Sequence, residues 1–236
     1  MGVYSYAWRF ASILLFCFLT FVQAAAQDSD AGTWNIITLK TIFSPKWSAF
    51  AEGQLRSLRF YNDFHYHEFK AGAVYKAHPN ATVALAFGKY DTYASGGNFE
   101  TPKNNAEYRL WPQFFVTQNL NKLKFENRTR VEFRFTSNGY RNRFRNRIGL
   151  SYPLIKTKKK APKLEVAIYN ELFFTNTEPY FERNRASVNL FYHLNSSSNI
   201  MLGYLQQFDY KINDETGKGF IQMGYSKTLN FSKKKF

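Results

Sequence analysis

The sequence predicts an all-β protein, an antiparallel up-and-down transmembrane β-barrel of about twelve strands within a range of ten to twelve. Three observations support this fold class. Apolar and polar residues alternate with a period of two along most of the chain, which is typical of strands with two unlike faces. Aromatic residues make up 19% of the 236 residues and form nearly continuous apolar faces. The alternating runs, of about 10–16 residues, are longer than soluble strands and suit strands that cross a bilayer at a tilt.

The N-terminus reads as a secretory signal peptide over Met1–Ala26. Arg9 supplies the positive charge, Phe10–Val22 is an apolar run, and Ala24–Ala26 provides small residues at a cleavage site. The apolar run is too short for a comfortable transmembrane helix. We expect residues 27–236 to form the exported barrel domain, and no helical period appears in them.

Eleven alternating segments follow a short polar lead. Each sets aromatic and aliphatic residues against charged or polar ones, and turns rich in Pro, Asn, Ser or Gly separate them. The expected segments are Trp34–Phe43, Lys46–Tyr61, Tyr66–Ala77, Ala81–Tyr90, Ala106–Gln118, the two halves of Lys122–Tyr152, Lys163–Thr175, Arg183–Leu194, Asn199–Ile212 and Phe220–Phe231.

The strand count conflicts with the usual rule for bacterial barrels, which have even numbers of strands. We therefore favour twelve, with one strand missed or merged, or else lead residues that thread the lumen. If the last strand descends to the periplasm, the long polar loop Asp91–Asn105 lies outside, and the first segment begins outside. Aromatic residues near segment ends are expected in the interfacial girdles: Trp34, Trp47, Tyr61, Tyr108 and Tyr152.

The hairpin Lys122–Tyr152 carries the densest charge. One face of each half is lined by Arg and Glu at intervals of two, and the other face is apolar. In a membrane barrel the charged faces point into the lumen. The lumen-lining candidates are Glu107, Arg109, Arg128, Arg130, Glu132, Arg134, Arg141, Arg143, Arg145, Arg147, Glu165, Glu171, Arg183 and Arg185.

These charges have two interpretations. An Arg/Glu lattice can fill and stiffen the lumen, because guanidinium groups pair well with carboxylates. Alternatively, the basic excess, +15 over the whole chain, can line a pore that favours small anionic solutes. Nucleic acid is not an expected partner, since the arginines lie on strand faces and no nucleic-acid motif is present.

No catalytic residue, metal site or cofactor is predicted. Cys17 is the only cysteine and lies in the signal peptide. His65 and His67 are spaced by two, so they are expected to point to the same side of a strand, and they could share a metal only if a carboxylate joined them. Ser137-Asn138-Gly139 is similar to a motif of outer-membrane phospholipases, but Phe135 stands where their histidine base would be. An outer-membrane lipid-modifying enzyme and a secreted soluble β-barrel or sandwich are kept as alternatives.

A set of short motifs resembles a Gram-negative family of predicted outer-membrane barrels catalogued only as a domain of unknown function. The resemblance spans most of the mature chain and implies an outer-membrane location with no assigned activity. Expected partners are outer-membrane lipid and the barrel-assembly machinery, which reads C-terminal aromatic residues such as Phe236. The motifs are Glu107–Gln113, Arg128–Arg134, Arg143–Arg145, Asn170-Glu171, Asn184-Arg185 and Gly203-Tyr204.

Overall fold

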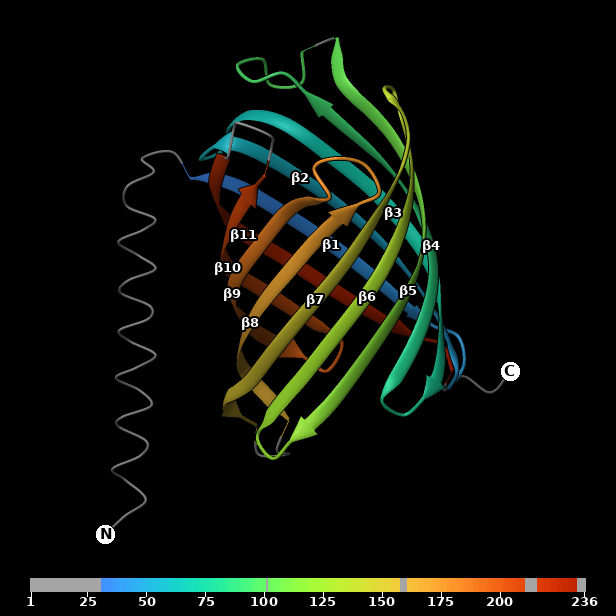
Figure 1. Cartoon of the computed structure of the whole chain (residues 1–236). Helices are drawn as coiled ribbons and strands as arrows, with labels where there is room; N and C mark the ends of the chain where they lie inside the picture. The colour runs from blue at the N-terminus through green and yellow to red at the C-terminus, as the bar shows by residue number, and fades with distance from the viewer. Residues whose placement is uncertain (1–30, 101, 158–160, 211–215, 233–236) are drawn as a thin grey trace.

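The computed structural model describes residues 31–100, 102–157, 161–210 and 216–232, which form a closed barrel of eleven strands (Figure 1). The expected signal peptide Met1–Ala26 and the terminal Phe236 lie outside the described residues. The strands are β1 (Gly32–Ile42), β2 (Trp47–Arg59), β3 (Asn62–His78), β4 (Ala81–Tyr93), β5 (Lys103–Leu120), β6 (Leu123–Thr136), β7 (Gly139–Lys156), β8 (Pro162–Thr175), β9 (Phe181–Asn195), β10 (Ser198–Asp209) and β11 (Thr216–Asn230).

The period of two in the sequence becomes the two surfaces of the wall. In β4, Leu85 and Phe87 are exposed on the outside, whereas Ala84, Ala86 and Tyr90 are buried inside. Successive side chains of a strand point to opposite faces, so each strand contributes one row to the lumen and one to the exterior. The predicted all-β, mainly antiparallel barrel is confirmed.

The prediction of twelve strands is wrong, and the count is eleven. Consecutive strands pair in antiparallel fashion, but β1 and β11 pair in parallel, from Gly32 opposite Phe220 to Ile42 opposite Asn230. An odd number of up-and-down strands makes the first and last run in the same direction. A parallel seam therefore closes the sheet, and the even-number rule does not apply.

The two ends of the barrel differ. We call the end that carries the β4–β5, β6–β7 and β8–β9 connections the long-loop rim, and the opposite end the short-turn rim. The strand β1 begins at the long-loop rim, and the chain leaves β11 at the short-turn rim (Figure 1). The expected loop Asp91–Asn105 is shorter than predicted, because β4 continues to Tyr93 and β5 begins at Lys103.

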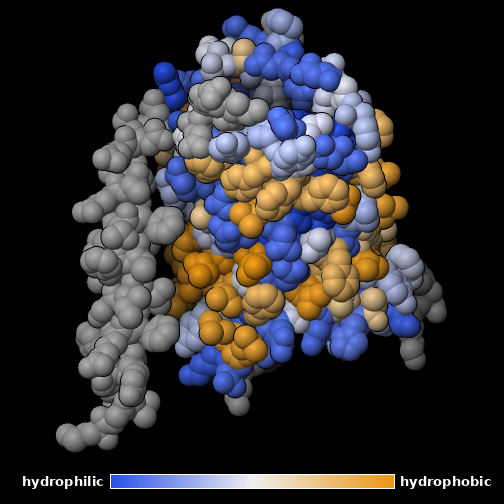
Figure 2. Space-filling model, in the orientation of Figure 1, coloured by the Kyte–Doolittle hydropathy of each residue, from blue (hydrophilic) through white to orange (hydrophobic). Residues whose placement is uncertain are grey.

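The outer surface is largely apolar. Apolar side chains gather across the middle of the visible face, with hydrophilic side chains above and below (Figure 2). A polar stripe interrupts them, where the amide of Asn146 donates to Thr129 and the amide of Asn184 donates to Asn170. Exposed apolar residues around the barrel include Ile37, Phe69, Phe87, Leu110, Phe114, Ile148, Ile168, Leu190 and Leu202.

Four of the five residues expected at the girdles lie on the outer face or in a rim turn. Trp47, Tyr61 and Tyr108 are exposed, and Tyr152 is half-buried. Trp34 is placed differently, inside the lumen, with 5% of its surface exposed. Inside, it offers its ring to lumen arginines. Within the described residues there is no helix long and apolar enough to span a bilayer.

The parallel seam can be tested by cross-linking. Ile37 and Tyr225 are register partners on the exposed face of β1 and β11. We expect the double variant Ile37→Cys/Tyr225→Cys to form a disulfide on mild oxidation, because directly paired residues lie within disulfide reach. The cross-link is measured as altered mobility of the denatured chain. The control pair Ile37→Cys/Ile200→Cys, one strand farther away, should stay open. A cross-link in the control alone would contradict the closure.

Candidate functional site

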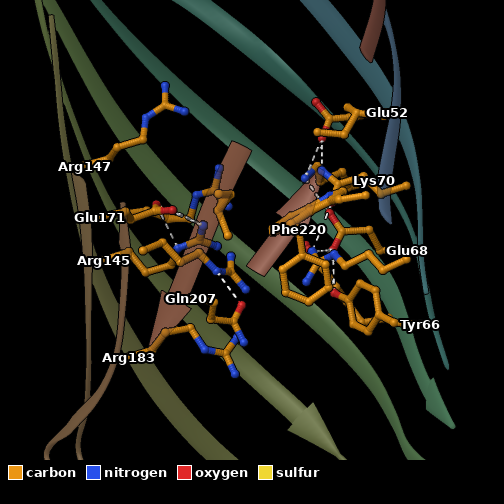
Figure 3. Close-up of a pocket in the computed structure, with 18 of the residues that line it drawn as sticks. Glu52, Tyr66, Glu68, Lys70, Arg145, Arg147, Glu171, Arg183, Gln207 and Phe220 are labelled. Carbon is orange, nitrogen blue, oxygen red and sulfur yellow. Dashed lines mark hydrogen bonds and ion pairs between the residues drawn. The ribbon is translucent and has the colours of Figure 1, made fainter. Parts of the chain in front are cut away.

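The barrel encloses a chamber of about 690 Å³, lined by inward side chains of most strands. Two groups of charged side chains face each other across it, one around Arg145 and Glu171 and one around Lys70 and Glu68 (Figure 3). Among the described residues, twelve lysine and arginine side chains line the chamber against five glutamates. The lumen therefore has a strong basic excess.

Glu132 on β6 organises the largest ion-pair cluster. Its side chain is fully buried, and Oε1 accepts hydrogen bonds from Arg145 at 2.6 Å and Arg130 at 3.3 Å. Its Oε2 lies 3.7 Å from Arg109 Nη1 and 3.8 Å from Arg143 Nη1. A buried carboxylate needs compensating charge, and here four guanidinium groups from three strands supply it.

Glu107 and Glu171 repeat the arrangement on either side. Arg109 donates to both oxygens of Glu107, at 2.7 and 2.9 Å, and Arg134 on the neighbouring strand also donates to both. Arg145 donates to both oxygens of Glu171 from Nη2, at 2.9 and 3.0 Å, and Arg128 donates to Oε1 at 2.6 Å. Arg145 thus joins Glu171 to Glu132, and the pairs form one connected lattice.

A second group lies on the wall formed by β2 and β3. Lys70 Nζ lies 2.6 Å from Glu68 and 2.7 Å from Glu52, and Tyr66 donates to Glu68 at 2.5 Å. Arg56 completes this group at 3.2 Å from Glu68. These residues are not among the fourteen lumen candidates, although the sequence places Glu52, Arg56, Glu68 and Lys70 on the polar faces of their segments, opposite outward residues such as Phe69 and Ala71.

Two β-bulges place residues in the chamber that strand parity does not predict. Glu182 is the extra residue where β9 slips against β8, and its two carboxylate oxygens accept hydrogen bonds from Nε and Nη2 of Arg143. His65 is the extra residue where β3 slips against β2. A bulge adds one residue and resets which side chains face inward. Both residues line the chamber, and sequence alternation alone missed them.

The bulge at His65 also separates the two histidines considered for a metal site. His65 faces the chamber, whereas His67 lies on the outer face, 3.2 Å from the hydroxyl of Tyr93 and against Phe99. The expectation that both point to the same side is wrong. In the described part of the chain, no group of three potential metal ligands is found. Ser137 lies in a rim turn, where its hydroxyl donates to Asn105.

Aromatic rings stabilise lumen arginines whose positive charge is not fully compensated by carboxylates. The guanidinium carbon of Arg56 lies 3.4 Å from the centroid of the Trp34 ring, and that of Arg185 lies 4.9 Å from it. Arg185 donates to Gln207 at 2.8 Å. Arg147 stacks on Tyr169 at 4.5 Å. Within the described residues, no ion pair joins Arg147 or Arg185 to a carboxylate. Such cation–π contacts stabilise positive charge without neutralising it.

Twelve of the fourteen predicted lumen candidates line the chamber. Glu132 is buried among the arginines behind it, and Glu165 is half-buried on the inward side of β8 and does not line the chamber. Arg141 lies near the long-loop rim, 4.0 Å from Glu182, and Arg183 pairs with Asp209. The arrangement can hold small anions electrostatically, at guanidinium groups that lack a full carboxylate partner.

Comparisons with known proteins identify a family and similarity to solved structures. No curated protein matches the chain. Among solved structures, an anion-selective porin from Comamonas acidovorans is similar, with 9% sequence identity and a TM-score of 0.37. The similarity covers 76% of this chain and 55% of the porin, so this chain spans about half of the porin's length. A family model described as "Protein of unknown function (DUF2490)" matches residues 31–218. The chain belongs to this family.

Proposed function

We propose that the protein is a porin-like barrel of the Gram-negative outer membrane that passes small anionic solutes. The observation that carries this proposal is the basic chamber, with twelve cationic side chains against five glutamates, inside a wall whose outside is apolar. A barrel in lipid has this polarity, since its backbone is satisfied within the sheet and its apolar rows face the acyl chains.

The charge distribution favours anions over cations. Arg147 and Arg185 rest on aromatic rings and an amide, and within the described residues no ion pair joins either of them to a carboxylate. Positive charge in a low-dielectric chamber raises the local concentration of anions. We propose no catalysis and no nucleic-acid partner, and we propose outer-membrane lipid and the barrel-assembly machinery as the contacts made during and after insertion.

A second candidate function is structural, with the lattice filling the lumen and the barrel closed to solutes. The connected pairs of Glu132, Glu107 and Glu171 favour it, because each carboxylate is held by at least two guanidinium groups. Conductance separates the two candidates. A barrel that inserts into a bilayer and conducts no ions would support the structural role.

The proposed outer-membrane location of the protein is tested first, by cell fractionation. We expect the exported chain to be found in the outer-membrane fraction and to show heat-modifiable mobility in detergent gels, because closed barrels resist unfolding by detergent until heated. Recovery of the chain in the soluble periplasmic fraction after osmotic release would support the soluble β-barrel alternative.

Ion selectivity is tested in planar bilayers. We expect an anion preference from the reversal potential in a salt gradient, and we expect Arg141→Glu/Arg147→Glu to reduce or reverse it, because four units of charge change inside the lumen. These two arginines are more suitable than Arg143 and Arg145, which hold buried glutamates. The control Lys46→Glu/Lys122→Glu makes the same charge change in exposed turns at the short-turn rim. Unchanged selectivity in the lumen variant would remove Arg141 and Arg147 from the ion path.

The lattice is tested through stability. We expect Glu132→Gln to destabilise the barrel by roughly 3–5 kcal/mol, because it leaves four buried guanidinium groups without their shared carboxylate. The measurement is the urea midpoint of unfolding in detergent or lipid vesicles. Glu165→Gln is the matched control, since Glu165 is half-buried and no ion pair joins it within the described residues; we expect about 0.5 kcal/mol or less. Equal urea midpoints for the two variants would contradict the conclusion that the ion pairs of Glu132 stabilise the barrel.

A further inference from the structure

The outer wall has an apolar groove of about 470 Å³ across β1 to β5, on the side of the barrel that carries the β4–β5 loop. Small residues form its floor, among them Ala51, Gly53 and Ala71. Large exposed side chains form its walls, Phe69 and Phe87 being more than half exposed. Small residues between large ones on the outer wall leave an apolar depression rather than a smooth surface.

A basic cluster stands at the end of this groove nearest the long-loop rim. Lys89 lines the groove, and its Nζ lies 6.0 Å from the ring of Tyr108. Lys103 Nζ and Lys89 Nζ lie 3.0 and 3.8 Å from the carboxylate of Asp91, and His67 Nε2 lies 3.7 Å from it. Asp91 is 2% exposed, whereas both lysine side chains remain partly open. Two lysines share one carboxylate, so the cluster carries a net positive charge.

The β4–β5 loop holds this cluster in place. The amide of Phe99 donates to the Phe64 carbonyl at 2.9 Å, and the amide of Gly96 donates to Asp63 at 2.6 Å. The ring of Phe99 packs against Tyr93 and His67, with centroids 5.2 and 5.6 Å away. The loop thus folds back onto the start of β3, on the outer face, beside the basic cluster.

We propose that this groove binds one molecule of lipid A, the phosphorylated and multiply acylated lipid of the outer leaflet. An acyl chain would lie in the groove, and a phosphate would lie between Lys89 and Lys103. Charge complementarity supports this occupant, because phosphate supplies the second anion that the two lysines lack, and basic side chains beside apolar surface are a common site for anionic lipid. The inference rests on the proposed outer-membrane location, with the long-loop rim outside.

Native mass spectrometry of the full chain in detergent tests the site. The probe is diphosphoryl lipid A, titrated against wild-type protein, with phosphatidylglycerol titrated in parallel. We expect Lys89→Gln/Lys103→Gln to weaken lipid A binding about tenfold or more, which corresponds to roughly 1.4 kcal/mol. We expect Ala51→Phe, which keeps both lysines and fills the groove floor, to weaken binding as well. The control Lys46→Gln/Lys122→Gln removes two exposed lysines at the opposite rim and should bind as the wild type does.

Each outcome decides the inference. Equal binding by the lysine variant and its control, with heat-modifiable mobility showing that both are folded, would overturn the site. Phosphatidylglycerol binding as tight as lipid A would overturn lipid A as the occupant. The conductance and fractionation measurements do not depend on Lys89 or Lys103. A barrel that inserts and conducts but does not bind lipid A therefore overturns this inference alone, whereas a chain that stays out of membranes overturns the proposed function.

Discussion

Closure of the hydrogen-bonded sheet is the constraint on which the rest of the structure depends. Every strand has a neighbour on both sides, so no row of backbone donors and acceptors is left at an edge. A closed sheet also has only an inside and an outside. Once β1 pairs with β11, each strand must sort its alternating side chains between a lumen and an outer wall. An odd number of strands requires this parallel seam, and β1 and β11 pair continuously along it from Gly32 to Ile42.

The lumen meets a second requirement, which is to keep many arginines in a confined space. Three devices achieve this. Carboxylates such as Glu132 are shared by several guanidinium groups. Aromatic rings such as Trp34 offer a face to Arg56. Amides such as that of Gln207 accept from Arg185. Only the first device neutralises charge, so the balance among the three decides whether the lumen is a neutral filling or a basic passage.

Much of the fold was predictable from the sequence, because alternation depends only on the geometry of strands. The hairpin Lys122–Tyr152 and the inward placement of its arginines follow from it. The predictions that were wrong or incomplete have specific causes. Strand number was misjudged because a rule about even barrels was given more weight than the eleven segments. Glu182 and His65 were missed because a bulge depends on how two strands slip past each other, which a single strand does not encode. Trp34 was placed outside because aromatic residues near strand ends are common on both faces.

The seam between β1 and β11 also bears on how the barrel forms. Every other strand pair joins neighbours in the chain, with a turn or a loop between them. The seam joins the first strand to the last, so it carries the largest loop-closure entropy of any pairing in the barrel. Hairpins can assemble one after another before that step, but the arginine lattice is enclosed on all sides only when the two ends meet. The pairing of β1 with β11 is thus the step that turns an open sheet, with its charged face accessible at two edges, into a closed barrel.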